Sequence, residues 1–368
     1  MPDEMRRIAI NTGGGDAPGL NAVIRAATIA AIGHGWEVLG IRDGYNGLLE
    51  PGSFPDGGVI QLGREAVRGI THLGGTILGT TNKGDPLRWP VRHSDGSEET
   101  VDRSDEIVRR LAERSVDALI AVGGDGSLSI ANALAAKGVN VVGVPKTIDN
   151  DLEETVVTFG YDTAIAFATE CIDRLHSTAE AHDRVIVVEV MGRYAGWIAV
   201  GAGVAGTADA ILIPELPYDL EPVAEKIRQR RRAGRDFAIV VVAEGAHPKG
   251  GERSVVEHES GRSERLGGIG EKVAAELGRL TGKETRVVNL GHLLRGGTPT
   301  ARDRLLALRF GAAAIRAVAS GSFGCMVALD PPEVRFVPLS RAVRRVKTVP
   351  LDSDLMRTAR DLGIVFGD

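Results

Sequence analysis

The chain has 368 residues, more than twice the roughly 150 of a typical domain, so two linked domains are expected. Its composition, 43% hydrophobic and 25% charged, is that of an ordinary globular chain and excludes an overall disordered one. The 44 Lys and Arg are outnumbered by 49 Asp and Glu, and neither end carries a basic run, which argues against a nucleic-acid partner. Two cysteines are too few for a disulfide framework and suit a reducing cytosol.

The termini and the apolar stretches give no sign of export or of a membrane partner. Residues Met1–Arg7 are polar and lack the apolar core of a signal peptide, so a cytoplasmic location is expected. The longest uncharged stretch, Tyr194–Ala208, is interrupted by glycines and falls short of the roughly 20 apolar residues that span a bilayer. We interpret it as a buried helix.

Short β-branched apolar runs recur along the chain and predict buried strands. Between most of them lie segments of helical length and pattern, such as Pro18–Ile32, Ser127–Ala136 and Asp162–Leu175. This alternation predicts an α/β fold of two doubly wound parallel sheets, whose ligands bind beyond the carboxyl ends of the strands. The predicted strands are Ile8–Ile10, Val38–Ile41, Ala118–Val122, Val141–Val144, Val185–Val190, Ala210–Ile213, Phe237–Ala243, Val287–Leu290 and Cys325–Leu329.

Two polar stretches, Lys83–Asp105 and Gly245–Gly270, interrupt the alternation of strands and helices. Both are long for ordinary loops, so we expect them to be either lids near a site or surface insertions. No Pro/Ser-rich linker marks a boundary between domains.

A glycine-rich turn, Thr12–Gly19, directly follows the first predicted strand. The glycines Gly13–Gly15 let the backbone approach a ligand closely. Asp16 can cap the next helix, and Pro18 suits that helix's first turn. Free N–H groups there predict an anion site, and a tight turn without a ligand is the alternative. The dinucleotide motif is excluded, because Pro18 stands where its third glycine belongs, and no P-loop motif occurs in the chain.

A second turn of the same design, Gly123–Ser127, follows another predicted strand. Gly124, Gly126 and Ser127 surround Asp125, whose carboxylate could bind a Mg²⁺ ion that bridges phosphate oxygens. Two such turns in one sheet indicate a polyphosphate ligand.

A third polar segment, Val144–Asp151, also follows a strand. Asp149 and Asp151 stand beside the Thr147 hydroxyl and the Lys146 ammonium, and could supply a general base and a metal or water ligand for phosphoryl transfer to an alcohol. Alone, Asp-Asn-Asp is more often a plain turn. The two glycine turns favour the functional interpretation.

Six blocks, in this order and at this spacing, resemble the 6-phosphofructokinase family from Ile8 to about Leu329. The blocks are NTGGGDAPGLNAVIRAA, GGDGS, PKTIDND, VVEVMGRYAG, VAEGA and LGHLLRGGTPTARDR. The resemblance implies phosphorylation of the 1-hydroxyl of fructose 6-phosphate in glycolysis, with Mg²⁺ as cofactor. One branch of the family uses ATP as donor and another uses pyrophosphate.

The resemblance also implies roles at the phosphoryl donor. The two glycine turns and Lys146 would bind the donor, and Asp125 would hold Mg²⁺. Asp149 corresponds to the general base, supported by Thr147 and Asp151.

The positions that match the family's sugar-phosphate site lie further along the chain. Arg193 would neutralise charge on the transferred phosphoryl group. Arg184 matches a residue supplied by a neighbouring subunit, which implies a homo-oligomer, dimer or tetramer, with shared active sites. For each arginine a solvated surface charge is the alternative. The remaining matches are Met191, Gly192 and Glu244 for the sugar, and Arg286, His292 and Arg295 for its 6-phosphate.

Two positions give opposite indications about the donor. Lys146 stands where the ATP branch has Gly and the pyrophosphate branch has Lys, whereas Gly126 stands where the pyrophosphate branch has Asp. An Asp there would intrude on the α-phosphate of a nucleotide, so Gly126 favours ATP, with a pyrophosphate-dependent enzyme as the alternative. In Gly79–Lys83 the ATP branch usually has an Arg that reaches the transferred phosphate, and Lys146 or Lys83 could replace its charge.

The resemblance implies that the active site is a cleft between two domains. Residues 1–160 with about 295–346 would bind the donor, and 161–294 with about 347–368 would bind the sugar phosphate.

Two alternative hypotheses give the chain a function other than phosphorylation of fructose 6-phosphate. A non-catalytic sensor of nucleotides or sugar phosphates is disfavoured, because Asp125, Asp149 and Arg193 are all retained. A kinase of the NAD or lipid type shares the G-G-D-G turn but lacks the other blocks.

Overall fold

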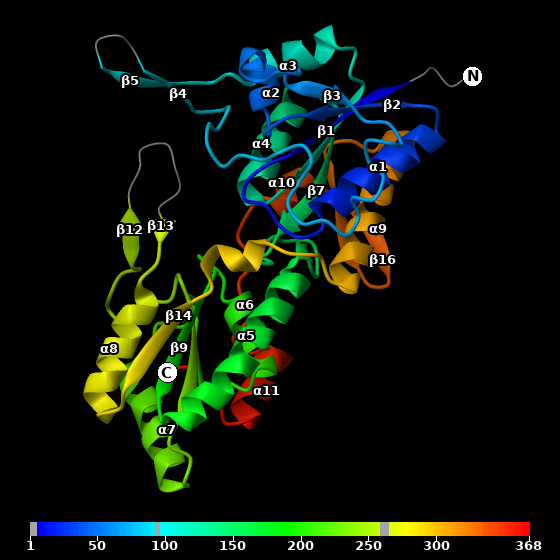
Figure 1. The fold of residues 1–368 in the computed structure, drawn as a ribbon. Helices are drawn as coiled ribbons and strands as arrows, with labels where there is room; N and C mark the ends of the chain where they lie inside the picture. Colours follow the sequence, from blue (N-terminus) through cyan, green and yellow to red (C-terminus); the bar gives the residue numbers. More distant parts are fainter. Residues whose placement is uncertain (1–5, 93–95, 258–264) are drawn as a thin grey trace.

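The computed structural model describes residues 6–92, 96–257 and 265–368, arranged around two main sheets (Figure 1). An eight-stranded sheet occupies the upper half of that view and a four-stranded sheet the lower half. No helix within the described ranges has both the length and the apolar character needed to cross a membrane.

The larger sheet has the strand order β16-β15-β7-β6-β1-β2-β3, with β8 paired to β7. Its inner strands are parallel, as predicted, but β3 and β16 at the two edges run antiparallel. The strands are β1 (Arg7–Thr12), β2 (Glu37–Ile41), β3 (Val59–Gln61), β6 (Ala118–Gly123), β7 (Val141–Thr147), β8 (Phe159–Gly160), β15 (Cys325–Asp330) and β16 (Glu333–Pro338).

Successive residues of the larger sheet point to two separate cores, because side chains alternate between the faces of a strand. Ile8 and Ile10 pack with α1 and α9, whereas Ala9 packs with α3, α4 and α10 on the other face. Both faces are therefore covered by helices. These are α1 (Leu20–Gly33), α3 (Ser104–Glu113), α4 (Asp125–Ala136), α9 (Ala301–Ala319) and α10 (Leu339–Ala342); the short α2 (Asn46–Leu49) and η1 (Pro51–Ser53) follow β2.

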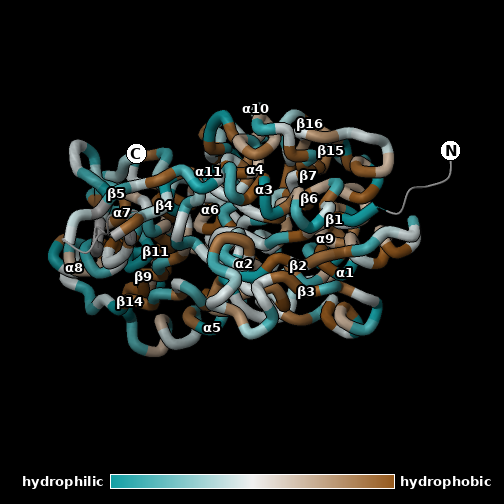
Figure 2. The backbone as a smooth tube through the Cα atoms, turned by 90° about the horizontal axis from the view of Figure 1, so that it is seen from above, coloured by the Kyte–Doolittle hydropathy of each residue, from teal (hydrophilic) through white to brown (hydrophobic). Residues whose placement is uncertain are grey.

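The smaller sheet has the order β10-β11-β9-β14 and is parallel throughout. Its strands are β9 (Val185–Val190), β10 (Ala210–Leu212), β11 (Ala238–Ala243) and β14 (Thr285–Asn289). Helices α5 (Tyr161–Ala181), α6 (Trp197–Ala205) and α11 (Asp354–Asp361) pack on one face, and α7 (Leu220–Arg232) and α8 (Ile269–Thr281) on the other. The predicted doubly wound α/β fold is confirmed. Apolar residues lie inside each half and hydrophilic ones at the outer turns (Figure 2).

The start of α1 differs from the prediction. The helix begins at Leu20 behind Gly19, which has φ 111° and no side-chain cap, so Asp16 does not cap it and Pro18 lies before it. A side chain at Gly19 would strike the Phe159 ring, with an added Cβ only 2.7 Å from Cδ2. This close packing moves the helix start two residues beyond the predicted one.

Each polar stretch contains an antiparallel hairpin that the sequence analysis did not predict. Strands β4 (Trp89–Arg92) and β5 (Glu98–Val101) pair in the first, and β12 (Val255–Glu257) and β13 (Arg265–Leu266) in the second. The segments 93–95 and 258–264 lie outside the described residues. The buried helix predicted within Tyr194–Ala208 is confirmed as α6.

Candidate active site

The three predicted turns meet beyond the carboxyl ends of three inner strands of the larger sheet, β1, β6 and β7. Strand β6 pairs in parallel with both β1 and β7, so the segments that follow these three strands lie side by side. The Gly13 N–H donates to the Val122 carbonyl at 2.9 Å, which joins the first turn to the end of β6. The predicted gathering of the turns beyond the carboxyl ends is therefore observed.

Lys146 forms hydrogen bonds with the backbone of the first glycine turn. Its side chain is only 3% exposed, and Nζ donates to the carbonyl of Gly13 at 2.9 Å and also to that of Gly15. Burial, together with the nearby charge of Arg295, lowers the pKa of the ammonium to about 7 against the opposing effect of Asp16 and Asp149. Lys146 thus ties two backbone carbonyls of the first turn to the end of β7.

The segment Gly79–Lys83 holds the same turn from its other side. Thr80 Oγ1 donates to the Gly14 carbonyl at 2.6 Å, and the Gly14 N–H donates to the Thr81 carbonyl at 3.0 Å. Lys83 is exposed next to these contacts.

The second turn leads straight into α4, which begins at Asp125. Ser127 packs against the first turn, since a Cβ added at Gly13 would lie 2.6 Å from Ser127 Oγ. A Cβ added at Gly124 would lie 3.4 Å from the Lys146 carbonyl oxygen. At Gly126, which is exposed, an added Cβ would meet no described atom within 4 Å. Space for a ligand or a larger residue therefore exists at Gly126.

The two carboxylates of the third turn, Asp149 and Asp151, are largely buried, and their negative charges repel each other. Burial raises the pKa of Asp149 to about 7, helped by Asp151 and opposed by Arg295 and Arg193. Burial also raises the pKa of Asp151, although a hydrogen bond from Thr147 lowers it. Oδ1 of each carboxylate is buried without a hydrogen-bond partner in the described part of the chain. Such orphaned oxygens are available for a proton or a ligand.

The smaller sheet contributes charged groups from the ends of β9 and β11. Met191, Gly192 and Arg193 follow β9, and Glu244 follows β11; the Gly245 N–H donates to the Gly192 carbonyl at 3.1 Å, which joins the two segments. Burial raises the pKa of Glu244, while Arg193 and Arg295 oppose this shift. Arg193 and Arg295 lower the pKa of both Asp149 and Glu244, and we refer to these charged groups from the two sheets, with Asp151, as the charge cluster.

The turn η2 (Gly291–Arg295) brings a further arginine to the cluster. Arg295 Nη1 donates to the Asp16 carbonyl at 3.2 Å, so it bridges from the end of β14 to the first glycine turn. A Cβ added at Gly15 would lie 2.6 Å from the same Nη1, so a larger residue there would displace the Arg295 guanidinium. His292, in the same turn, is exposed.

Arg184 and Arg286 do not join this cluster within the chain. Both form ion pairs with Glu284, and Arg184 Nε lies 3.0 Å from its Oε2, at the amino end of the smaller sheet. Arg184 precedes β9 whereas Met191 follows it, so the strand separates them by roughly 23 Å at about 3.3 Å per residue. The structure thus places Arg286 beside Arg184 rather than with His292 and Arg295.

Glu215, which the sequence analysis did not single out, holds a segment beside the site. Its carboxylate accepts hydrogen bonds from the Gly196 N–H at 3.0 Å and from the Val349 N–H at 2.8 Å. It follows the strand predicted at Ala210–Ile213, so its place beyond a carboxyl end was an available signal.

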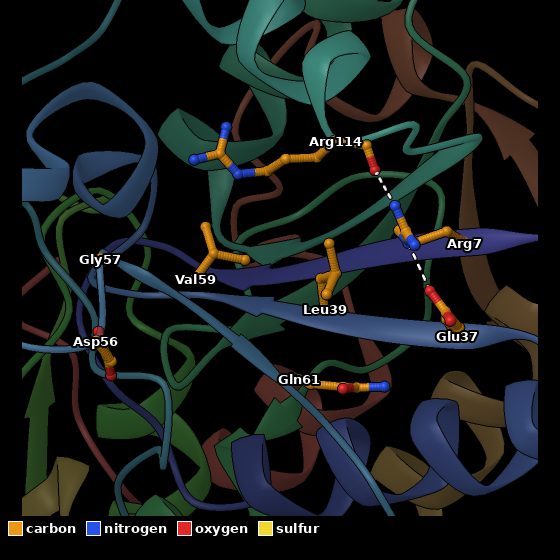
Figure 3. Close-up of a pocket in the computed structure, with 8 residues that line it drawn as sticks. All are labelled: Arg7, Glu37, Leu39, Asp56, Gly57, Val59, Gln61 and Arg114. Atoms are coloured by element: carbon orange, nitrogen blue, oxygen red, sulfur yellow. Dashed lines mark hydrogen bonds and ion pairs between the residues drawn. The ribbon is translucent and has the colours of Figure 1, made fainter.

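A cavity of about 460 Å³ lies away from these turns (Figure 3). Arg7 at the start of β1 and Glu37 at the start of β2 line it and form an ion pair of 2.6 Å. Its lining residues come from β1, β2, β3 and the segments beside them and include none of the three turns, so it is not part of the candidate site.

Comparison with known proteins identifies the family of this chain. The phosphofructokinase family model matches residues 7–318. An ATP-dependent 6-phosphofructokinase of Chloroflexus aurantiacus is 51% identical over 368 residues, covering 100% of this chain and 99% of that protein. A pyrophosphate–fructose 6-phosphate 1-phosphotransferase of Amycolatopsis mediterranei is 49% identical over 350 residues, covering 94% and 97%.

Among solved structures, Pichia pastoris phosphofructokinase in the T-state superposes with a TM-score of 0.79 and 31% identity. The match covers 93% of this chain and 36% of the Pichia chain, so this chain spans just over a third of that one. With the family model matched over most of its length and a relative 51% identical from end to end, the chain belongs to the phosphofructokinase family.

Proposed function

We propose that this chain transfers a phosphoryl group from MgATP to the 1-hydroxyl of fructose 6-phosphate, giving fructose 1,6-bisphosphate and ADP. The observation that carries the proposal is the charge cluster formed by residues of both sheets: Asp149 and Asp151 on one side, Arg193, Glu244 and Arg295 on the other. The glycine turns of the larger sheet would bind the donor. The smaller sheet would bind the sugar phosphate.

In this mechanism Asp149 is the general base. It takes the proton of the 1-hydroxyl as that oxygen bonds to the γ-phosphorus, while the bond from this phosphorus to the bridging oxygen of ADP breaks. Arg193, whose positive charge lowers the pKa of Asp149, neutralises the charge that spreads over the transferred group. Met191, Gly192 and Glu244 orient the sugar, and His292 and Arg295 bind its 6-phosphate.

The carboxylates present fit a Mg²⁺ ion that is shared with the donor. Burial raises the pKa of Asp125, and the negative charge of Asp151 raises it further, so the two carboxylates are near enough to interact; Asp151 Oδ1 has no hydrogen-bond partner among the described residues. The described residues contain no group of three or more His, Cys, Asp and Glu side chains suited to a metal. Mg²⁺ typically binds through one or two carboxylates plus substrate phosphates, so Asp125, supported by Asp151, would hold it. The ion would withdraw charge from the phosphate oxygens.

The two donors are favoured by different residues. A Cβ added at Gly126 meets no described atom within 4 Å, and this open space, which the α-phosphate of a nucleotide would need, supports ATP. Lys146 supports pyrophosphate only by its resemblance to that branch, and its ammonium is engaged by two backbone carbonyls of the first turn. ATP is therefore the donor that we propose, and pyrophosphate the second candidate.

Product analysis tests the transfer itself. The purified chain with fructose 6-phosphate, MgATP and aldolase should release triose phosphates, because aldolase cleaves the 1,6-bisphosphate and not the monophosphate. No triose phosphate, with ATP consumed only by hydrolysis, would overturn the assignment of the acceptor.

The reaction should depend on pH through Asp149. A general base must be deprotonated, so kcat/KM should rise with pH through an apparent pKa near 7, where burial and Asp151 raise the pKa of Asp149, and not near the value of an exposed Asp. The measurement is kcat/KM for fructose 6-phosphate from pH 5.5 to 8.5. A flat profile across this range would contradict the role of Asp149.

We also propose that Arg184 and Arg286 complete the sugar-phosphate site of a neighbouring subunit. Both lie at the far end of the smaller sheet from Asp149, where Glu284 holds them together. In a two-fold dimer each subunit would lend these arginines to the other.

Mixing two inactive proteins tests the shared site. Asp149→Asn and Arg184→Ala are co-denatured and refolded; in a mixed dimer one site holds both intact residues and the other holds neither. About half of randomly paired dimers are mixed, so roughly a quarter of wild-type sites should return. If mixed oligomers form and remain inactive, Arg184 acts within its own subunit.

A further inference from the structure

A short segment near the C-terminus connects the two halves of the candidate site. We define the C-terminal strap as residues Val346–Val349, which lie beyond the end of the family match at residue 318. In Figure 1 the orange-red chain after α10 passes from the upper half to α11 in the lower half. Val346 pairs with Leu152 as an isolated β-bridge, so the strap runs directly behind the third turn.

Lys347 of the strap binds this turn and the residues after it through both its side-chain ammonium and its backbone N–H. Its Nζ donates to Asn150 Oδ1 at 3.0 Å, to the Thr155 carbonyl at 2.9 Å and to the Val156 carbonyl at 3.2 Å. Its backbone N–H donates to the Asp151 carbonyl at 2.8 Å. An ammonium has three donors, and all three are used here, one on the Asn150 side chain and two on the backbone carbonyls of Thr155 and Val156.

The contact to Asn150 matters because of this residue's conformation. Asn150 separates Asp149 from Asp151 and has a φ of 51°, in the left-handed region that few side chains tolerate. It is 3% exposed, and its amide oxygen also accepts a hydrogen bond from the Thr158 N–H at 3.1 Å. Lys347 and Thr158 therefore hold the residue that sets the directions of the two carboxylates.

The other contacts of the strap reach the sugar side of the site. The Lys347 carbonyl accepts a hydrogen bond from Trp197 Nε1 at 3.0 Å, and Trp197 begins α6 directly after the segment that carries Arg193. Glu215 accepts from both the Val349 N–H and the Gly196 N–H, at 2.8 and 3.0 Å. The strap is thus bonded to the segments that carry Asp149 and Arg193.

From this geometry we infer that Lys347 is a positioning residue for phosphoryl transfer: it holds the Asn150 turn so that Asp149 meets the hydroxyl bound on the smaller sheet. The inference rests on the proposed function. It assigns Lys347 no contact with substrate. Misplacing a reacting group by about 1 Å can cost on the order of 10² in rate, so the loss should appear in kcat.

The test compares Lys347→Met with Arg345→Met. Arg345 belongs to the same stretch and pairs with Glu153 at 2.8 Å, but its side chain is 76% exposed, so its removal is a matched loss of one cation. Lys347→Met should lower kcat about 10- to 100-fold, while KM for fructose 6-phosphate and for the donor stays within about threefold. Arg345→Met should stay within about twofold in both constants.

A second variant, Asn150→Gly, removes the acceptor and tolerates the positive φ. Its kcat should fall in the same way, and the loss in the double variant should be smaller than the product of the two single losses, because both changes break the hydrogen bond between Lys347 and Asn150, although each also removes contacts of its own. Full additivity, or an unchanged kcat in Lys347→Met, would overturn the inference. If Lys347→Met does not fold, an unchanged kcat in Asn150→Gly overturns it.

Hydrogen exchange gives a readout that does not depend on activity. In Lys347→Met, amides of residues 148–158 should exchange faster than in the wild type and in Arg345→Met. Should the wild type fail to phosphorylate fructose 6-phosphate, the proposed function fails while this comparison still decides whether Lys347 holds the turn. Unchanged exchange would remove the physical basis of the inference.

Discussion

An Asp149→Asn variant is expected to fold like the wild type and to lose about 10²–10⁴ in kcat, the typical contribution of a general base. The amide keeps the shape of the carboxyl group and cannot take the proton of the sugar hydroxyl. Folding should be retained, because burial and Asp151 already favour the uncharged form of this side chain. Steady-state kinetics and a thermal melt on the same preparation check both parts.

Asp209→Asn is the matched control for this prediction. Asp209 is also buried, and its carboxylate pairs with Arg230 at 2.8 Å and accepts the Ile239 N–H at 3.0 Å, but it lies away from the three turns. Its replacement should lower Tm and leave kcat within about twofold. A correctly folded Asp149→Asn protein with near-wild-type kcat would show that Asp149 is not the base.

A Gly126→Asp variant is expected to weaken ATP much more than pyrophosphate. The new carboxylate would face the α-phosphate of a nucleotide, which pyrophosphate lacks. Two like charges about 4 Å apart repel by about 1 kcal/mol in water and about 4 kcal/mol at an effective dielectric constant of 20. Because Gly126 is exposed, we expect an intermediate value and a rise in KM for ATP of about ten- to a hundredfold.

Gly126→Ala controls for the added side chain without its charge. An added Cβ meets no described atom within 4 Å, so both donors should keep their KM within about twofold. The Asp variant should also fold, since an acidic residue is favourable in the first turn of α4. An equal loss with both donors in Gly126→Asp would remove the argument for ATP that rests on this position.

The inner strands were predictable because they are buried on both faces. Val185–Val190 has exactly the predicted bounds, and all of its residues are buried, as expected of a central parallel strand. The antiparallel edge strand β16 was missed, because exposed residues interrupt its apolar ones and leave no continuous run. The start of α1 was misplaced because the close approach of Phe159 to Gly19 is a tertiary contact.

The candidate site divides in the same way. Asp125, Asp149, Arg193 and Glu244 could be placed from sequence, since each follows a strand of a parallel sheet. The bonds of Lys146 to the first turn could not, because they join segments more than a hundred residues apart.

The positions of Arg286 and Lys347 were also not predicted, and the sequence carried an indication for only one of them. Arg286 immediately precedes the strand predicted at Val287–Leu290, so its place at the amino end could have been inferred. Lys347 lies outside the blocks that resemble the family, and no pattern around it indicates its contacts.

The most direct test of the central claim is a parallel measurement of kcat/KM for the two donors. The purified chain is given saturating fructose 6-phosphate and Mg²⁺ with either ATP or pyrophosphate, and fructose 1,6-bisphosphate is quantified. We predict that fructose 1,6-bisphosphate forms. We also predict that kcat/KM with ATP exceeds kcat/KM with pyrophosphate by at least about tenfold, because the open space at Gly126 favours a nucleotide. A higher kcat/KM with pyrophosphate, or no bisphosphate with either donor, would contradict the account.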